Sequence, residues 1–178
     1  MEEKPRSTTQ IGLHYGLITG IALVVFSLIL FIAEQHMNRT LSYFSFVLMI
    51  GGMVWGTLEY RKTSLNGYIP YGKAFSSCFM IGLFAGIVAA IYAYFFAQFI
   101  HPGYGEEIID KAREGMMSSG QEMSEEQMNT ALEWTRKFTS PVMMAIWGLI
   151  VYIAGSAIIA LIVAIFLKKE DPTLNTTV

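Results

Sequence analysis

Long apolar segments alternate with shorter polar ones along the chain. The apolar segments, residues 11–33, 41–58, 75–100 and 142–167, are almost free of ionisable side chains. About 20 helical residues at roughly 1.5 Å per residue cross the roughly 30 Å hydrocarbon core of a bilayer. Lipid offers the backbone no hydrogen bonds, and residues 87–91 lack the alternating polarity of a barrel strand. The pattern therefore predicts four transmembrane helices.

The polar segments complete the predicted fold class, which is all-α and polytopic. They are a cytoplasmic N-terminal tail (1–10), a cytoplasmic loop (59–74), an external loop (101–141) and a cytoplasmic C-terminal tail (168–178). The orientation follows from the Lys and Arg residues, which favour the cytoplasmic side in short loops. That side receives Lys4, Arg6, Arg61, Lys62, Lys73, Lys168 and Lys169.

The external loop is expected to form an amphipathic helical hairpin. Its apolar residues recur at helical spacing in two stretches. The first is marked by Ile108, Ile109, Ala112 and Met116, and the second by Met128, Ala131, Leu132, Thr135 and Phe138. Residues 118–120 interrupt the pattern, and residues 124–127 match a capping box at the start of the second stretch.

Composition and charge exclude several classes of protein. The chain has 178 residues, of which 53% are hydrophobic and only 15% are charged, unlike an ordinary soluble domain. A net charge of −2 provides no basic surface for nucleic acid. The single cysteine, Cys78, cannot form an intrachain disulfide and is expected to be an apolar filler. Residues 11–33 exceed the apolar region of a signal peptide, so this helix is expected to be retained.

Small residues recur at every fourth position in all four apolar segments. They are Gly12, Gly16 and Gly20; Gly52 and Gly56; Gly82, Gly86 and Ala90; and Ser156, Ala160 and Ala164. This spacing lets helix backbones approach closely inside a membrane. We therefore expect a tightly packed bundle, and the pattern leaves open whether these faces pack within one chain or form a homo-oligomer.

Candidate chemistry is sparse. His14 is interpreted as a hydrogen-bonded structural histidine near the inner interface, and no acidic or basic side chain lies at the middle of a span. His36 and His101 are both expected outside, near Glu34, Glu106 and Glu107, but their spacing matches no metal motif. Asn38 and Asn175 begin sequons that we attribute to chance. No catalytic, cofactor-binding or metal-binding residue is assigned.

The most distinctive local pattern lies in the cytoplasmic loop, at Tyr68-Ile69-Pro70-Tyr71-Gly72-Lys73-Ala74-Phe75. Gly82, Gly86, Tyr92-Ala93-Tyr94, Ile100-His101-Pro102 and Lys168-Lys169 follow it. With these motifs the chain resembles domain-of-unknown-function family 4199, short membrane proteins of Bacteroidetes-type bacteria. The resemblance implies the inner membrane as location and transfers no activity. From the residues themselves, Gly72 is expected to permit a sharp entry into the third helix, and Lys73 to reach the membrane surface.

These observations favour a non-enzymatic accessory or scaffold protein of the inner membrane. Its expected partners are the lipid bilayer and a protein bound at the external loop 101–141. Two other functions stay open: a small transport or channel component acting as an oligomer, and a membrane enzyme with its site at the outer face.

Overall fold

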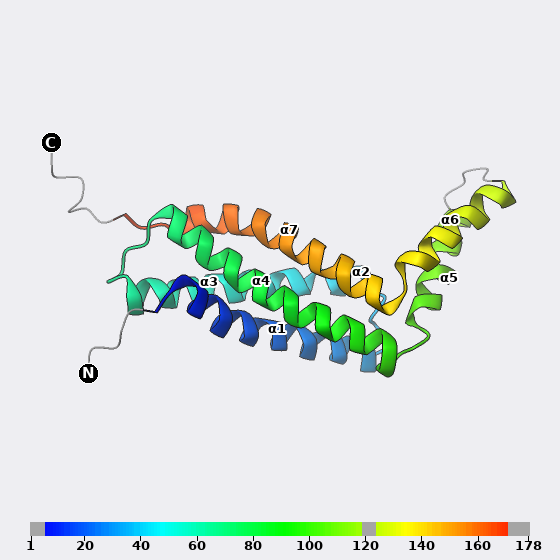
Figure 1. Ribbon diagram of the computed structural model, residues 1–178, viewed down its shortest axis with the longest axis horizontal. Helices are drawn as coiled ribbons and strands as arrows, with labels where there is room; N and C mark the ends of the chain where they lie inside the picture. Colours follow the sequence, from blue (N-terminus) through cyan, green and yellow to red (C-terminus); the bar gives the residue numbers. More distant parts are fainter. Residues whose placement is uncertain (1–5, 119–123, 171–178) are drawn as a thin grey trace. The chain divides into compact units, whose positions relative to one another are not determined.

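The computed structural model describes residues 6–118 and 124–170, which are helical throughout apart from short connections (Figure 1). The helices are α1 (Thr8–Ile32), α2 (Arg39–Ser42), α3 (Phe44–Ser64), α4 (Tyr71–Phe95), η1 (Phe96–Ile100), α5 (Tyr104–Ser118), α6 (Glu125–Phe138) and α7 (Pro141–Leu167). Within these residues the only strand-like pairing is an isolated bridge between Ile69 and Lys169. Lys4, the sequon at Asn175, part of the predicted break at 118–120, half of the N-terminal tail and most of the C-terminal tail lie outside the described residues.

Four helices are long and apolar enough to cross a membrane, as the sequence predicts. They comprise Thr8–Ile32, Thr40–Ser64, Tyr71–Ile100 and Pro141–Leu167. The all-α fold class is therefore confirmed.

The first of these helices begins earlier than predicted. Ser7 caps α1: its hydroxyl accepts a hydrogen bond from the Gln10 amide at 3.2 Å, while the Gln10 side chain accepts one from the Ser7 amide at 2.9 Å. This capping box satisfies amide groups that have no partner inside the helix. The hydrophobic pattern starts only at residue 11, so it did not reveal the cap.

The loop predicted at residues 59–74 is shorter in the structure. Helix α3 continues to Ser64, and Tyr60, in its last turns, is only 4% exposed. Burial of the Tyr60 ring stabilises an additional turn of helix. The charged residues around Tyr60 gave no sign in the sequence that the helix continues. The sharp turn is made by Asn66 and Gly67, which have φ values of 51° and 86°. The expectation for Gly72 was therefore wrong, because it lies inside the first turn of α4.

The chain divides into two compact units. The first comprises Met1–Ala89 and Ile150–Val178, and the second comprises Ala90–Leu149. Helices α4 and α7 each contribute to both, so each unit is described by itself.

In the first unit, glycines mark the places where helices pack. A Cβ atom added to Gly16 of α1 would lie 2.6 Å from Cβ of Phe84 in α4, and one added to Gly20 would lie 2.7 Å from Cβ of Val88. A Cβ atom on Gly86 of α4 would lie 2.8 Å from Cβ of Tyr152 in α7. Such approaches require the absence of a side chain. The predicted tight packing is thus present within one chain, and the homo-oligomer stays a prediction.

The core of the first unit is apolar, with a few hydroxyl groups that are hydrogen-bonded. Ile11, Met53 and Ile81 are fully buried. The hydroxyl of Thr57 donates to Ser77 Oγ at 3.2 Å, and that of Ser156 donates to the Ile153 carbonyl at 2.9 Å. Among the described residues of this core, no Asp, Glu, Lys or Arg is buried. The buried polar groups are therefore satisfied without any charge.

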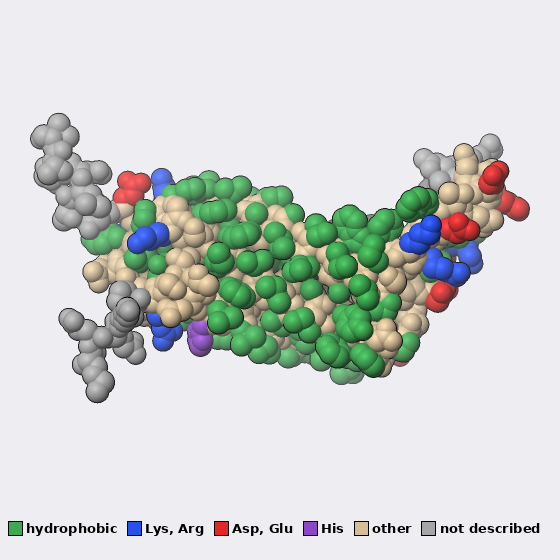
Figure 2. Space-filling model, viewed as in Figure 1, with side chains coloured by type: hydrophobic (Ala, Val, Ile, Leu, Met, Phe, Trp, Pro, Cys, Tyr) green, Lys and Arg blue, Asp and Glu red, His purple; other side chains and the backbone are tan. Residues whose placement is uncertain are grey.

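The surface of the first unit is hydrophobic except at one end, as Figure 2 shows for one face. Ile21, Ile158 and Phe166 are 52%, 61% and 79% exposed. In water such a surface would be costly, whereas it suits contact with lipid.

At this charged end of the first unit, several contacts tie the chain segments together. Ile69 and Lys169 exchange two backbone hydrogen bonds of 2.8 Å, and Arg61 donates to the Leu167 carbonyl at 3.2 Å. The Tyr71 hydroxyl donates to the Leu161 carbonyl at 3.3 Å. These bonds join the loop after α3 to the end of α7.

Candidate functional site

The described part of the second unit contains the candidate site, which begins where α4 changes its winding. Residues Phe96–Ile100 form a π-helix, η1, and the His101 amide donates to the Phe96 carbonyl at 2.7 Å. Single π-turns within α-helices often occur at functional sites. No residue pattern in this apolar stretch indicated it. Its effect is to close the helix directly before His101 and Pro102.

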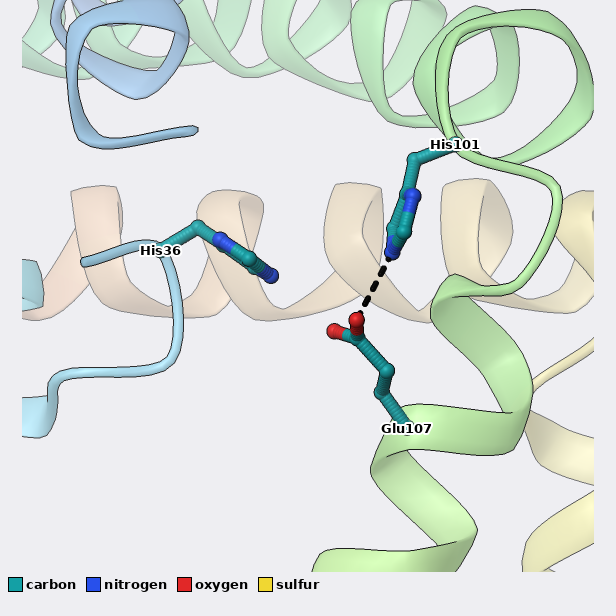
Figure 3. A group of neighbouring side chains, drawn as sticks. All are labelled: His36, His101 and Glu107. Atoms are coloured by element: carbon teal, nitrogen blue, oxygen red, sulfur yellow. Dashed lines mark hydrogen bonds and ion pairs between the residues drawn. The ribbon is translucent and has the colours of Figure 1, made fainter. Parts of the chain in front are cut away.

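His101 is paired with Glu107 of α5. Its Nε2 atom lies 3.0 Å from Glu107 Oε1 (Figure 3), and both side chains are partly buried. The sequence placed His101 near both Glu106 and Glu107, and the structure pairs it with Glu107. The bond orients the imidazole ring, and it joins the end of η1 to the first turns of α5.

Tyr104 lies beside this pair and anchors the start of α5. Its ring packs edge-on against Phe96, with centroids 5.2 Å apart. Burial raises the pKa of Tyr104, and the negative charge of Glu107 and the neighbouring Tyr92 add to the rise. The shift moves the pKa of the phenol further from neutral pH, so Tyr104 is protonated and uncharged there. Burial as the main cause means that the Tyr104 ring lies in a largely apolar environment.

Glu106 points to a different partner. Its Oε2 atom lies 3.4 Å from Arg136 Nη2 on α6, in an exposed ion pair. Both side chains line a shallow cavity of about 260 Å³ within the second unit, together with Ala97, Pro102, Gly105, Ile109, Thr139, Ser140, Pro141 and Met144. The cavity is smaller than most ligand pockets, and its two charges neutralise each other.

The other two histidines belong to the first unit. His36, also labelled in Figure 3, follows α1, and its ring lies 5.5 Å from that of Phe31. Glu34 nearby is exposed, with a φ of 55°. His14 is exposed on α1, and the contact seen for it is with the ring of Tyr15 at 5.0 Å rather than the expected hydrogen bond.

The His101–Glu107 pair of the second unit offers fewer ligands than a protein metal site normally has. Structural zinc sites use four protein ligands and catalytic sites use three. His101 and Glu107 together offer one imidazole and one carboxylate. We assign no metal to this pair, and the expectation that the protein uses no metal or cofactor stays a prediction.

One residue that the sequence analysis did not single out is Trp134. It lies on α6, 57% exposed, with its ring stacked on Phe138 at 6.2 Å. The signal available in the sequence was a pair of aromatic residues four apart next to Lys137. Phe138 was predicted on the apolar face of this helix, and it is 41% exposed there.

Comparison with known proteins identifies the family. No curated protein and no solved structure shows a significant match to the chain. The family described as protein of unknown function, DUF4199, matches residues 14–169, which include His36, the His101–Glu107 pair and all of α3 to α7. The chain therefore belongs to the DUF4199 family.

Proposed function

We propose that the protein is a non-enzymatic accessory or scaffold component of the bacterial inner membrane, and that it binds a partner protein through α5 and α6. The observation that supports this is a contrast between the two units. The described core of the first unit holds only hydroxyl groups and apolar side chains, whereas α5 and α6 present exposed charged faces. A packed, uncharged bundle suits the role of an anchor.

Helix α5 has the features of a recognition surface. Glu106, Asp110 and Glu114 are exposed at four-residue intervals, so they form one acidic row on the helix. Ile109 is buried about 100° around the helix from Asp110, the middle of the row, and α5 contacts α6. The acidic row therefore lies on a helix whose buried apolar residue already packs inside the second unit. Glu106 and Asp110 are each in an exposed ion pair, with Arg136 at 3.4 Å and Arg113 at 3.9 Å. The acidic charge that the row keeps, with Glu114, favours a partner with a basic surface.

Two other functions have less support. A transport pathway normally needs ionisable groups or a polar lining within the membrane, and the hydroxyl groups of the described core are buried and hydrogen-bonded. A membrane enzyme at the outer face would have to use His101 and Glu107, and the neighbours that His101 has in the described second unit include, besides Glu107, the rings of Phe96 and Tyr104.

Site-specific photo-crosslinking tests the proposal. A photoreactive amino acid replaces Glu114 in one variant and the exposed apolar residue Ile158 of α7 in the control. After illumination of cells, we expect a discrete adduct of one partner from position 114 and none from position 158. Reversing the row with Asp110→Lys should reduce this adduct several-fold, whereas Glu170→Lys should not change it.

The proposal is wrong if position 114 yields no specific adduct or if both positions capture the same proteins. Equal labelling would mean that the adducts reflect abundance in the membrane and not recognition.

A further inference from the structure

Three aromatic side chains form a continuous exposed surface in the second unit, at the junction of α6 and α7. Trp134, Phe138 and Trp147 are 57%, 41% and 45% exposed. Trp134 stacks on Phe138 with ring centroids 6.2 Å apart, and Phe138 meets Trp147 edge-on at 5.7 Å. Scattered exposed apolar residues need no explanation, but a contiguous set of large ones indicates an interaction surface.

This surface is not the one with which α6 packs against α5. Leu132 is the buried residue of α6, whereas Trp134 and Phe138 lie 200° and 240° further around a helix of 100° per residue. The aromatic pair therefore faces away from the side that Leu132 buries. Whatever covers the Trp134 and Phe138 rings therefore comes from outside the α5–α6 pair.

The surface continues onto the part of α7 that would enter a bilayer. Val142 and Ile146, in the first turns of α7, are 56% and 47% exposed, and Trp147 follows them. Trp147 is six residues after Pro141, or about 9 Å along the helix axis. That depth matches the boundary between headgroups and acyl chains, where interfacial helices bury their apolar faces.

The charges next to the aromatic rings fit phospholipid. Lys137 Nζ lies 5.0 Å from the centre of the Trp134 ring. The nearest charged residues in sequence are Glu133 and Arg136, and Arg136 pairs with Glu106. Tryptophan is enriched at membrane interfaces, and a long cationic side chain reaches from an apolar surface to phosphate.

We propose that the C-terminal half of α6 is an interfacial membrane-binding segment: Trp134 and Phe138 insert at the headgroup–acyl boundary of the leaflet where α7 begins, and Lys137 contacts lipid phosphate. This segment would hold the α5–α6 pair at the bilayer surface through the end of α6 that leads into α7. This inference is independent of the partner protein proposed above.

Fluorescence quenching in proteoliposomes tests it. The chain has three tryptophans, so Trp55→Phe combined with Trp147→Phe leaves Trp134 as the single reporter. We expect strong quenching by phosphatidylcholine brominated near the top of its acyl chains, weaker quenching by lipid brominated near the methyl end, and little quenching by aqueous iodide. The matched control carries Trp55→Phe, Trp134→Phe, Trp147→Phe and Met117→Trp. Position 117 is 61% exposed on α5, so iodide should quench this tryptophan several-fold more than Trp134.

Two results would overturn the inference. Iodide quenching of Trp134 equal to that at position 117, with no effect of brominated lipid, would place the aromatic surface in water. Protection of Trp134 in native membranes but not in proteoliposomes would show that a protein covers it. The variants keep an aromatic ring at positions 55 and 147, so we expect them to fold. A single symmetric peak in size-exclusion chromatography checks this.

Discussion

Gly16 shows how a single missing side chain sets helix packing in this protein. It lies on the buried face of α1, where an added Cβ atom would meet Cβ of Phe84 at 2.6 Å and the Ile81 carbonyl oxygen at 2.8 Å. The second contact is with backbone, which cannot rotate away. We expect Gly16→Ala to lower the free energy of unfolding by about 1–3 kcal/mol, the usual cost of overpacking. Denaturant titration of the purified protein in detergent measures it.

Gly155→Ala is the matched control, because nothing lies within 4 Å of a Cβ atom at that position of α7. Because alanine is favoured over glycine in a helix interior by about 0.5–1 kcal/mol, this variant should be as stable as the parent or slightly more stable. Equal losses for both variants would contradict the close approach of α1 to α4.

At the scale of an element, α6 depends on its first turn. The Ser124 hydroxyl accepts a hydrogen bond from the Gln127 amide at 3.3 Å, and the Gln127 side chain accepts one from the Ser124 amide at 3.1 Å. Ser124→Ala removes the hydroxyl acceptor, so we expect the local stability of α6 to fall by about 1 kcal/mol. Amide hydrogen exchange across Glu125–Phe138 should then be faster, while α1, with its own cap at Ser7, should exchange as before.

Ser124→Asp provides the control, since aspartate is an equally good cap and its charge suits a helix N-terminus. Exchange in α6 should remain slow in this variant. Fast exchange in both variants would mean that the cap does not govern the helix.

At the scale of the whole molecule, the distribution of cationic residues predicts the orientation in the membrane. The Arg6 amide donates to Ser64 Oγ at 3.2 Å, and Ile69 pairs with Lys169, so the start of α1, the loop after α3 and the end of α7 meet at one end of the first unit. That end carries Arg61 and Lys62, and short cytoplasmic segments are enriched in such residues. We predict that it faces the cytoplasm.

Cysteine accessibility measures this orientation. In a Cys78→Ala background, a membrane-impermeant maleimide should label Asn129→Cys on intact cells, and Glu170→Cys only after the cells are permeabilised. Cys78 is fully buried, and its replacement leaves the introduced cysteine as the single thiol in each variant. Labelling in the reverse order would show that the protein has the opposite orientation.

The sequence alone determined the fold class, because the length and apolarity of a segment decide whether it can cross a bilayer. It also located the cap at Ser124 and the two amphipathic stretches, since capping and helical periodicity are local properties. The same local signals placed His101 close to Glu106 and Glu107. They could not choose between the two carboxylates.

Only the tertiary structure decided that choice. Contact between α5 and α6 brings Glu106 to Arg136 and leaves Glu107 to His101, and no local pattern encodes the register of two helices. The extension of α3 likewise depends on burial of Tyr60 by distant segments, and the exposure of Trp134 depends on which side of α6 packs. Periodicity shows that a helix has an apolar face, but the partner that covers each part of this face is set by packing between elements far apart in the chain.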